Sequence, residues 1–234
     1  MNILITGASR GIGAAAYALL RKHGHDVRGH STMGTDSLIA GDLMDPAAPR
    51  AIWDTALDEL RGTIDVLVNN AGIYEGVADN APDEEWHAAW HRTLTINLQA
   101  AADLSRLAVS HFLDRGGGGR IVNISSRAAF RGDSPQHWHY AASKAALVGM
   151  TKTIARGYAA EGILCFAVAP GFTVSEMTAD YLQGRGGAQI VADIPLGRVA
   201  STDEVAEVIR WLATDAPPSA TGSIIDVNGA SYVR

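Results

Sequence analysis

The sequence predicts a doubly wound α/β fold built around one parallel sheet of about seven strands. Short apolar segments of strand length alternate with longer helical patterns along the whole chain. Such alternation is typical of parallel strands that are joined by right-handed crossovers. With 234 residues, 47% of them hydrophobic, the chain is long enough to bury one substantial core, and we expect a single domain over residues 1–234.

The strands and helices follow from this alternation. Strands are expected at residues 2–6, 27–30, 38–40, 65–68, 120–124, 164–169 and 223–226. Helices are expected at residues 11–23, 47–60, 83–115 with a break, 135–160 and 202–214. Only residues 31–37 separate the second strand from the third, so this shortened crossover is expected to be a loop. Four glycines at 116–119 precede a strand and indicate a turn; phosphate binding is the alternative, but no helix follows them.

Composition and charge exclude several classes of function. The net charge is −6 and basic residues form no run, which argues against nucleic acid as a partner. No segment reaches membrane-spanning length, and we expect a cytoplasmic protein without a membrane partner. The single cysteine, Cys165, lies in an apolar strand and is expected to be buried. His137 and His139 flank a tryptophan, but no carboxylate or cysteine stands at ligand spacing, so no metal is expected.

A glycine-rich loop follows the first strand and opens the first helix, in the run Thr-Gly-Ala-Ser-Arg-Gly-Ile-Gly. Glycines let the backbone approach a diphosphate, and a helix N-terminus offers unpaired N–H groups with partial positive charge. A tight strand-to-helix turn alone would also use glycine. In this position, however, the loop predicts a dinucleotide site formed by Gly7, Ser9, Arg10, Gly11, Ile12 and Gly13.

The residues beyond this loop favour NADP (NADPH) over NAD. A carboxylate at the tip of the second strand would bind the ribose 2′-hydroxyl and repel a 2′-phosphate, but none is present there. Arg10, together with His30 and Ser31, is placed to bind the 2′-phosphate by charge-assisted hydrogen bonds. The alternative is that Arg10 is a solvated surface residue and that Asp36 turns towards the ribose.

Tyr140 and Lys144 form the most informative pair in the chain. They lie four residues apart within a predicted helix and therefore share one face. A nearby ammonium is expected to lower the pKa of a phenol, which suits proton transfer near neutral pH. Ser125 and Ser126 lie upstream at the end of the fifth strand, and either serine can reach the same site.

Taken in order, these motifs resemble the short-chain dehydrogenase/reductase family, and in particular its 3-oxoacyl-(acyl-carrier-protein) reductase-like branch. The resemblance spans nearly the whole chain and includes the glycine loop, Asp42-Leu43, Asn69-Asn70-Ala71-Gly72, Asn97, Ser126, Tyr140, Lys144 and Pro170-Gly171. It implies a single-domain Rossmann-type sheet with strand order 3-2-1-4-5-6-7. It also implies interconversion of a carbonyl and a secondary alcohol by hydride transfer with NADP(H).

The resemblance also implies roles for individual residues. Tyr140 would be the general acid and base, Lys144 would hold the nicotinamide ribose, Ser126 would bind the carbonyl oxygen, and Asn97 would support a water on the proton path. Ser126 is preferred to Ser125 from the register of the family strand. Further cofactor contacts are implied for Asp42, Leu43, Asn70, Ala71, Gly72, Pro170, Gly171, Thr173 and Ser175. Family members also suggest a homotetramer formed through the two long helices, with a dimer as the alternative.

The substrate is the least determined part of this interpretation. Segments 127–139 and 172–195 are expected to form the substrate loops, with Tyr74 opposite, and their aromatic and basic residues suit an apolar body with an anionic end. Glu161 stands where acyl-carrier reductases tend to place a basic residue, which disfavours a carrier-bound substrate. A 3-oxoacyl-thioester reductase and a non-catalytic dinucleotide sensor remain alternatives. The physiological substrate, reaction direction and stereochemistry are not predicted.

Overall fold

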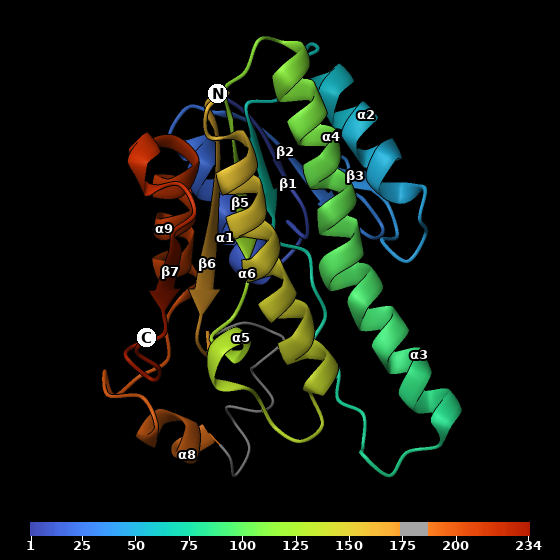
Figure 1. Ribbon diagram of the computed structural model, residues 1–234, viewed down its shortest axis with the longest axis vertical. Helices are drawn as coiled ribbons and strands as arrows, with labels where there is room; N and C mark the ends of the chain where they lie inside the picture. The colour runs from blue at the N-terminus through green and yellow to red at the C-terminus, as the bar shows by residue number, and fades with distance from the viewer. Residues whose placement is uncertain (174–186) are drawn as a thin grey trace.

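Seven parallel strands form the centre of the molecule, which is a computed structural model that describes residues 1–173 and 187–234 (Figure 1). Their order across the sheet is β3-β2-β1-β4-β5-β6-β7, as predicted. The strands are β1 Asn2–Ile5, β2 Asp26–Ser31, β3 Leu38–Ala40, β4 Val66–Asn69, β5 Gly119–Ile124, β6 Ile163–Pro170 and β7 Ile224–Val227. The order reverses between β1 and β4, so a crevice is expected where these two strands end.

Helices cover both faces of this sheet (Figure 1). One face is covered by α2 Ala48–Glu59, α4 Ala100–Asp114 and α6 Trp138–Tyr158, and the other by α1 Gly11–Lys22 and α9 Thr202–Thr214. The remaining helical segments are α3 Asp83–Leu94, α5 Ala128–Arg131, α8 Gly187–Ala192, a π-helical segment at Thr95–Gln99 and a 3₁₀ turn at Pro218–Ala220. No helix in the described ranges is long and apolar enough to cross a bilayer.

Strand side chains alternate between two separate cores. Leu67 of β4 points into the core under α2, α4 and α6, whereas its neighbours Val66 and Val68 point into the core under α1 and α9. All three side chains are fully buried. Cys165 of β6 is buried in the first of these cores, as its apolar sequence predicts. This burial on both faces explains why the strands read as continuous apolar runs.

The break that was expected within residues 83–115 is the π-helical segment Thr95–Gln99. It joins α3 to α4 and contains the buried Asn97. A π turn inserts one extra residue into a helix and locally redirects its side chains, and such turns are frequent at functional sites. The helix break therefore sets the direction in which Asn97 points.

The loops agree with the sequence in two places and differ in two. The β2–β3 crossover is a loop, and Gly116, Gly117 and Gly118 form the turn before β5, which begins at Gly119; all four glycines have positive φ. Segment 127–139 is not one loop, because it contains α5 and the first turn of α6. Segment 172–195 contains α8, and the part of it at 174–186 lies outside the described residues.

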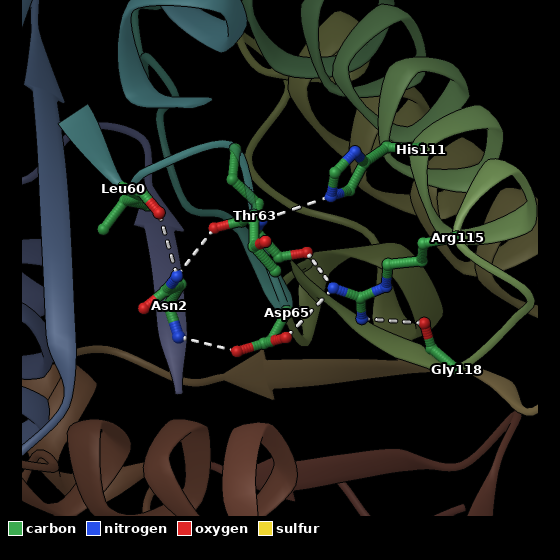
Figure 2. Close-up of polar contacts among 8 residues, drawn as sticks. Asn2, Leu60, Thr63, Asp65, His111, Arg115 and Gly118 are labelled. Atoms are coloured by element: carbon green, nitrogen blue, oxygen red, sulfur yellow. Dashed lines mark hydrogen bonds and ion pairs between the residues drawn. The ribbon is translucent and has the colours of Figure 1, made fainter. Parts of the chain in front are cut away.

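A polar cluster joins the amino-terminal ends of β1 and β4 to the end of α4 (Figure 2). The Asn2 backbone N–H donates to Asp65 at 2.8 Å, and the Asn2 side chain donates to two carbonyl oxygens of the α2–β4 connection. Arg115 donates to the carbonyl oxygens of Ile64 and Gly118 and to the carboxylate of Asp65, at 2.9–3.0 Å. One guanidinium thus satisfies three acceptors at an edge where strand ends would otherwise lack partners.

We predict that Arg115→Ala lowers the free energy of unfolding by about 1–3 kcal/mol, because it leaves these partly buried acceptors without a donor. Urea denaturation followed by circular dichroism measures this change. Arg50→Ala is the matched control, since Arg50 makes only an exposed i,i+4 ion pair with Asp54, worth about 0.3–0.5 kcal/mol. Equal losses for the two variants would contradict a structural role for the Arg115 cluster.

Candidate active site

A cavity of about 840 Å³ lies at the carboxyl ends of β1, β4, β5 and β6. Ligands of open α/β sheets bind at this edge, next to the point where the strand order reverses. Most of the residues expected to bind cofactor or to act in catalysis line it: Gly7, Ser9, Arg10, Gly11, Ile12, Gly13, His30, Ser31, Asp42, Leu43, Asn70, Ala71, Gly72, Ser126, Tyr140, Lys144, Pro170, Gly171 and Thr173. Asn97 lies behind the wall, and Ser175 lies outside the described residues.

The glycine loop is tied to the end of β4 by two polar side chains. The Thr6 hydroxyl accepts the backbone N–H groups of Asn70 and Ala71, at 3.1 and 3.0 Å. The Asn70 side-chain amide donates to the carbonyl oxygens of Thr6 and Gly7, both at 2.9 Å. A Cβ atom at Gly13 would overlap the Gly7 carbonyl and the Asn70 amide, so this position requires glycine. The ends of β1 and β4 are therefore held together, and they form the floor of the cavity.

The N-terminus of α1 faces the cavity without a cap from the protein. Its N-cap residue, Arg10, makes no side-chain capping bond, and the first turn contains no acidic residue. Its first-turn backbone N–H groups and its partial positive charge therefore face the cavity, where a diphosphate would complete the cap. The residues present fit a dinucleotide.

His30 supports the glycine loop from below. Its Nε2 lies 2.9 Å from the carbonyl oxygen of Gly41, so Nε2 carries the proton, and Nδ1 then accepts the Gly7 N–H at 3.4 Å. The side chain is 2% exposed, and burial lowers its pKa. Because both ring nitrogens are used within the protein, His30 positions the loop, and the expectation that it binds the 2′-phosphate is not supported by this geometry. Ser31 lines the same wall and accepts the Gly34 N–H at 3.1 Å.

Ser125 and Ser126 differ in what they contact. The Ser125 hydroxyl donates to the Lys144 carbonyl at 2.8 Å and fixes α6 against the end of β5. Ser126 accepts the Ala128 N–H at 3.1 Å, and it lies close enough to the Tyr140 phenol to act to lower the tyrosine pKa. Ser126 is therefore the serine that is placed beside the phenol.

Burial has the largest effect on the pKa of the Tyr140 phenol. Burial raises this pKa to about 12, opposite to the lowering by Lys144 that the sequence suggested. Burial also lowers the pKa of Lys144 to about 8. The Lys144 ammonium donates to the Ile124 carbonyl at 2.9 Å and lies 5.7 Å from the centre of the Tyr140 ring. In this arrangement Tyr140 is neutral at physiological pH, the protonation state in which a phenol donates a proton.

Asn97 is a positioning residue in this structure. Its side-chain oxygen accepts the Ile73 N–H at 2.8 Å, and its amide donates to the Ile73 carbonyl at 3.0 Å. The same amide donates to Ser143 at 3.3 Å, and Ser143 donates to the Tyr140 carbonyl at 2.7 Å. Asn97 thereby joins the loop that follows β4 to the helix that carries Tyr140.

Aromatic side chains close the other half of the cavity. The Tyr74 ring stacks on His137 at a centroid distance of 4.0 Å and meets the edge of Tyr140 at 4.8 Å. The Tyr74 hydroxyl donates to Asp133 at 3.1 Å. His137 also bonds Ser134, and His139 is fully buried near Trp90; neither histidine lines the cavity. His137 is therefore held by the Tyr74 ring and the Ser134 hydroxyl, whereas both ring nitrogens of His139 are buried without a hydrogen-bond partner among the described residues.

Sequence reasoning missed several residues of the site. Thr6, Ser143 and Arg92 were not expected to take part, yet the first two position the floor and α6, and Arg92 lines the cavity. Ser143 lies one turn beyond Tyr140 and next to Lys144, a spacing from which its role was deducible. Nothing in the sequence places Arg92 at this cavity, because it comes from a distant segment, whereas Asp193, which also lines the cavity, lies within the expected substrate loop 172–195.

Comparisons with known proteins agree with this geometry. The family model described as enoyl-(acyl carrier protein) reductase matches residues 7–230. The chain is 35% identical to 3-oxoacyl-(acyl-carrier-protein) reductase FabG of Escherichia coli, over 98% of this chain and 96% of that protein. It is 36% identical to FabG of Thermotoga maritima, over 98% and 97% of the two chains.

Solved structures agree as well. A short-chain dehydrogenase from Burkholderia cenocepacia, crystallised in complex with NADP, superposes with a TM-score of 0.88 at 30% identity, over 98% of this chain and 97% of that one. A Serratia marcescens short-chain dehydrogenase/reductase variant superposes with a TM-score of 0.89 at 29% identity, over 99% and 97%. The chain therefore belongs to the short-chain dehydrogenase/reductase family of oxidoreductases.

Proposed function

We propose that this protein is an NADPH-dependent reductase that converts a carbonyl to a secondary alcohol, and that Tyr140 is its general acid. The observation that carries the proposal is the convergence of Ser126, Tyr140 and Lys144 on a cavity that begins at an uncapped helix N-terminus. When bound, the nicotinamide supplies the hydride. The protein then has to orient the carbonyl and deliver a proton to its oxygen.

The roles of the residues follow from their surroundings. Neutral Tyr140 donates its proton to the carbonyl oxygen as that oxygen gains charge, and Ser126 donates a second hydrogen bond to the same atom. Lys144 is buried, so its ammonium provides a cation close to the ribose and the phenol. Asn97 keeps α6 in register with the strand end through Ile73 and Ser143.

The choice of NADP rests on the wall next to Arg10. The tip of β2 carries Ser31 and Thr32 and no carboxylate, and both line the cavity. Asp36, the alternative ribose partner, does not line it. The Burkholderia relative was solved with NADP, which supports the same choice.

A 3-oxoacyl thioester is the second candidate substrate class, because the FabG relatives are named for it. The exposed Glu161 argues against an acidic carrier protein. Arg115 and Arg120, the basic residues near it, donate to backbone carbonyls of their own chain. This surface lies at the amino-terminal edge of the sheet, opposite the cavity of the same chain.

We also propose a homotetramer assembled through α4 and α6, with a dimer as the alternative. The outward face of α6 carries the exposed small residues Ala142, Ala145 and Gly149, which permit close packing of a second helix.

Tyr140→Phe is expected to reduce turnover by about 10²–10⁴-fold, because the general acid is lost while the ring is kept. NADPH affinity is expected to change less than about threefold, since the ring still fills its place. Steady-state carbonyl reduction and NADPH fluorescence titration measure the two effects. Ser126→Ala is expected to approach the loss seen for Tyr140→Phe, because the second hydrogen bond to the carbonyl oxygen is removed. Near-normal turnover of Tyr140→Phe would refute the general-acid role.

Arg10→Ala is expected to weaken NADPH binding by at least about tenfold, because a charge-assisted contact to the 2′-phosphate is removed. NADH lacks this phosphate, so its affinity is expected to change little. Lys22→Ala, at the opposite end of α1, is the control for a general change in charge. Equal losses of NADPH and NADH affinity would instead assign Arg10 to the fold of the loop.

NADPH affinity is expected to fall as the pH rises through about 8, by up to about tenfold per pH unit, because Lys144 loses its charge in the free enzyme there. Protonation strengthens binding of an anionic cofactor, so the affinity is highest below pH 8. Fluorescence titration between pH 7 and 9.5 measures this dependence. Lys144→Met is expected to bind weakly at every pH in this range. A flat profile for the wild type would show that the ammonium charge does not contribute to binding.

A further inference from the structure

Arg127 follows Ser126 directly and lines the cavity beside it. Its backbone N–H donates to the carbonyl oxygen of Pro170 at 2.9 Å, which ties the residue to the end of β6. Its guanidinium lies over the Phe172 ring, 4.8 Å from the ring centre. The guanidinium is therefore held by the end of the sheet and by an aromatic face, within one residue of the serine proposed to bind the reacting carbonyl.

Three arginines line the half of the cavity opposite the glycine loop, and two of them are matched by carboxylates. Arg92 is paired with Glu75 at 3.2 Å, and Arg131 is paired with Asp193 at 2.7 Å. Arg127 has no ion pair with any residue in the described ranges. Among these three arginines, Arg127 is therefore the one whose charge is not paired by the described residues, whereas Lys144, which also lines the cavity, lies beside Tyr140 and is proposed to hold the ribose.

The Arg127 guanidinium is also incompletely hydrogen-bonded. Its Nη1 atom is buried and has no hydrogen-bond partner. Burial, together with the nearby charge of Arg131, lowers the arginine pKa, and Asp193, Asp133 and Tyr74 oppose this shift without forming an ion pair with Arg127. The described residues therefore leave the guanidinium incompletely hydrogen-bonded, and the part of it that lines the cavity can bind an anionic ligand.

We propose that Arg127 is a specificity-determining residue that binds a carboxylate of the substrate, and that the substrates are oxo acids or the corresponding hydroxy acids. A guanidinium forms two parallel hydrogen bonds with a carboxylate, which orients the carbonyl as well as attracting the anion. Phe172, below the guanidinium, keeps that plane in place. This inference rests on the proposed carbonyl reduction and adds the class of substrate.

A carboxylate fits this site better than a phosphate monoester or a carrier-bound thioester. Lys144 is assigned to the nicotinamide ribose, and Arg92 and Arg131 are already paired, so Arg127 is left to balance one carboxylate, whereas a phosphate dianion requires two cations. A thioester carries no charge beside its carbonyl group, so it would leave the charge of Arg127 unbalanced. The proposal therefore predicts discrimination against substrates that differ only in this charge.

Matched acid and ester pairs test the proposal directly. NADPH oxidation is measured with phenylglyoxylate, acetoacetate and levulinate, in which the distance from carbonyl to carboxylate increases, and with the methyl ester of each. The wild type is expected to show a kcat/KM at least about tenfold higher for the best acid than for its ester. In Arg127→Met this ratio is expected to fall to near one, mainly through KM of the acid, and Arg127→Lys is expected to recover part of it.

Arg92→Met is the matched control, because it removes a cation from the same cavity wall that is already paired with Glu75. It is expected to keep the wild-type ratio of acid to ester. A neutral N-acetylcysteamine thioester of acetoacetate and acetol phosphate complete the panel. Preference of the wild type for the thioester, for the phosphate or for the esters would overturn the carboxylate proposal while leaving carbonyl reduction in place.

Two further outcomes distinguish failure of the Arg127 proposal from failure of the proposed carbonyl reduction. An acid-to-ester ratio that is unchanged in Arg127→Met would overturn the role of Arg127, even if the acids are good substrates. Reduction of no compound by a wild-type protein that binds NADPH would refute the proposed function itself, and the substrate class with it. Thermal unfolding of each variant verifies that the ratios are compared between folded proteins.

Discussion

The contact between the ends of β1 and β4 is the interaction on which the rest of the site depends. The side chains of Thr6 and Asn70 make four hydrogen bonds across this junction, and Gly13 packs where no side chain fits. These bonds fix the glycine loop, and the loop aims the N-terminus of α1 into the cavity. The cavity that begins at this loop continues along the strand ends to Tyr140. The way in which two strands end thus determines where the cavity begins.

A second constraint holds the catalytic helix against these strands. Ser125 bonds the backbone of α6 at Lys144, and the π-helical segment turns Asn97 so that it reaches Ile73 and Ser143. The helix is therefore attached at two adjacent residues, Ser143 and Lys144, one turn beyond Tyr140. This explains how buried polar groups remain in one arrangement despite the desolvation that raises the pKa of Tyr140 and lowers that of Lys144.

The sheet order and most of the cavity wall could be predicted from the sequence, because local patterns determine them. Apolar runs specify strands, and glycine spacing after β1 specifies the loop. Features that depend on contacts between residues far apart in the sequence could not be predicted. The break near Asn97 was expected, but its π geometry depends on bonds to Ile73, more than twenty residues earlier. The lowering of the Tyr140 pKa was predicted from Lys144 alone and was wrong, since burial depends on the whole fold.

The same distinction applies to charge in the cavity. Arg92, Arg127 and Arg131 are equivalent in a composition count, and only the fold pairs Arg92 with Glu75 and Arg131 with Asp193. Paired arginines support the wall, because their charge is already balanced where they stand. An unmatched arginine attracts an anion, and its position next to Ser126 determines which part of the substrate that anion must belong to. Family membership describes the reaction that Tyr140 supports, whereas the substrate is selected by a residue outside the motifs that define the family.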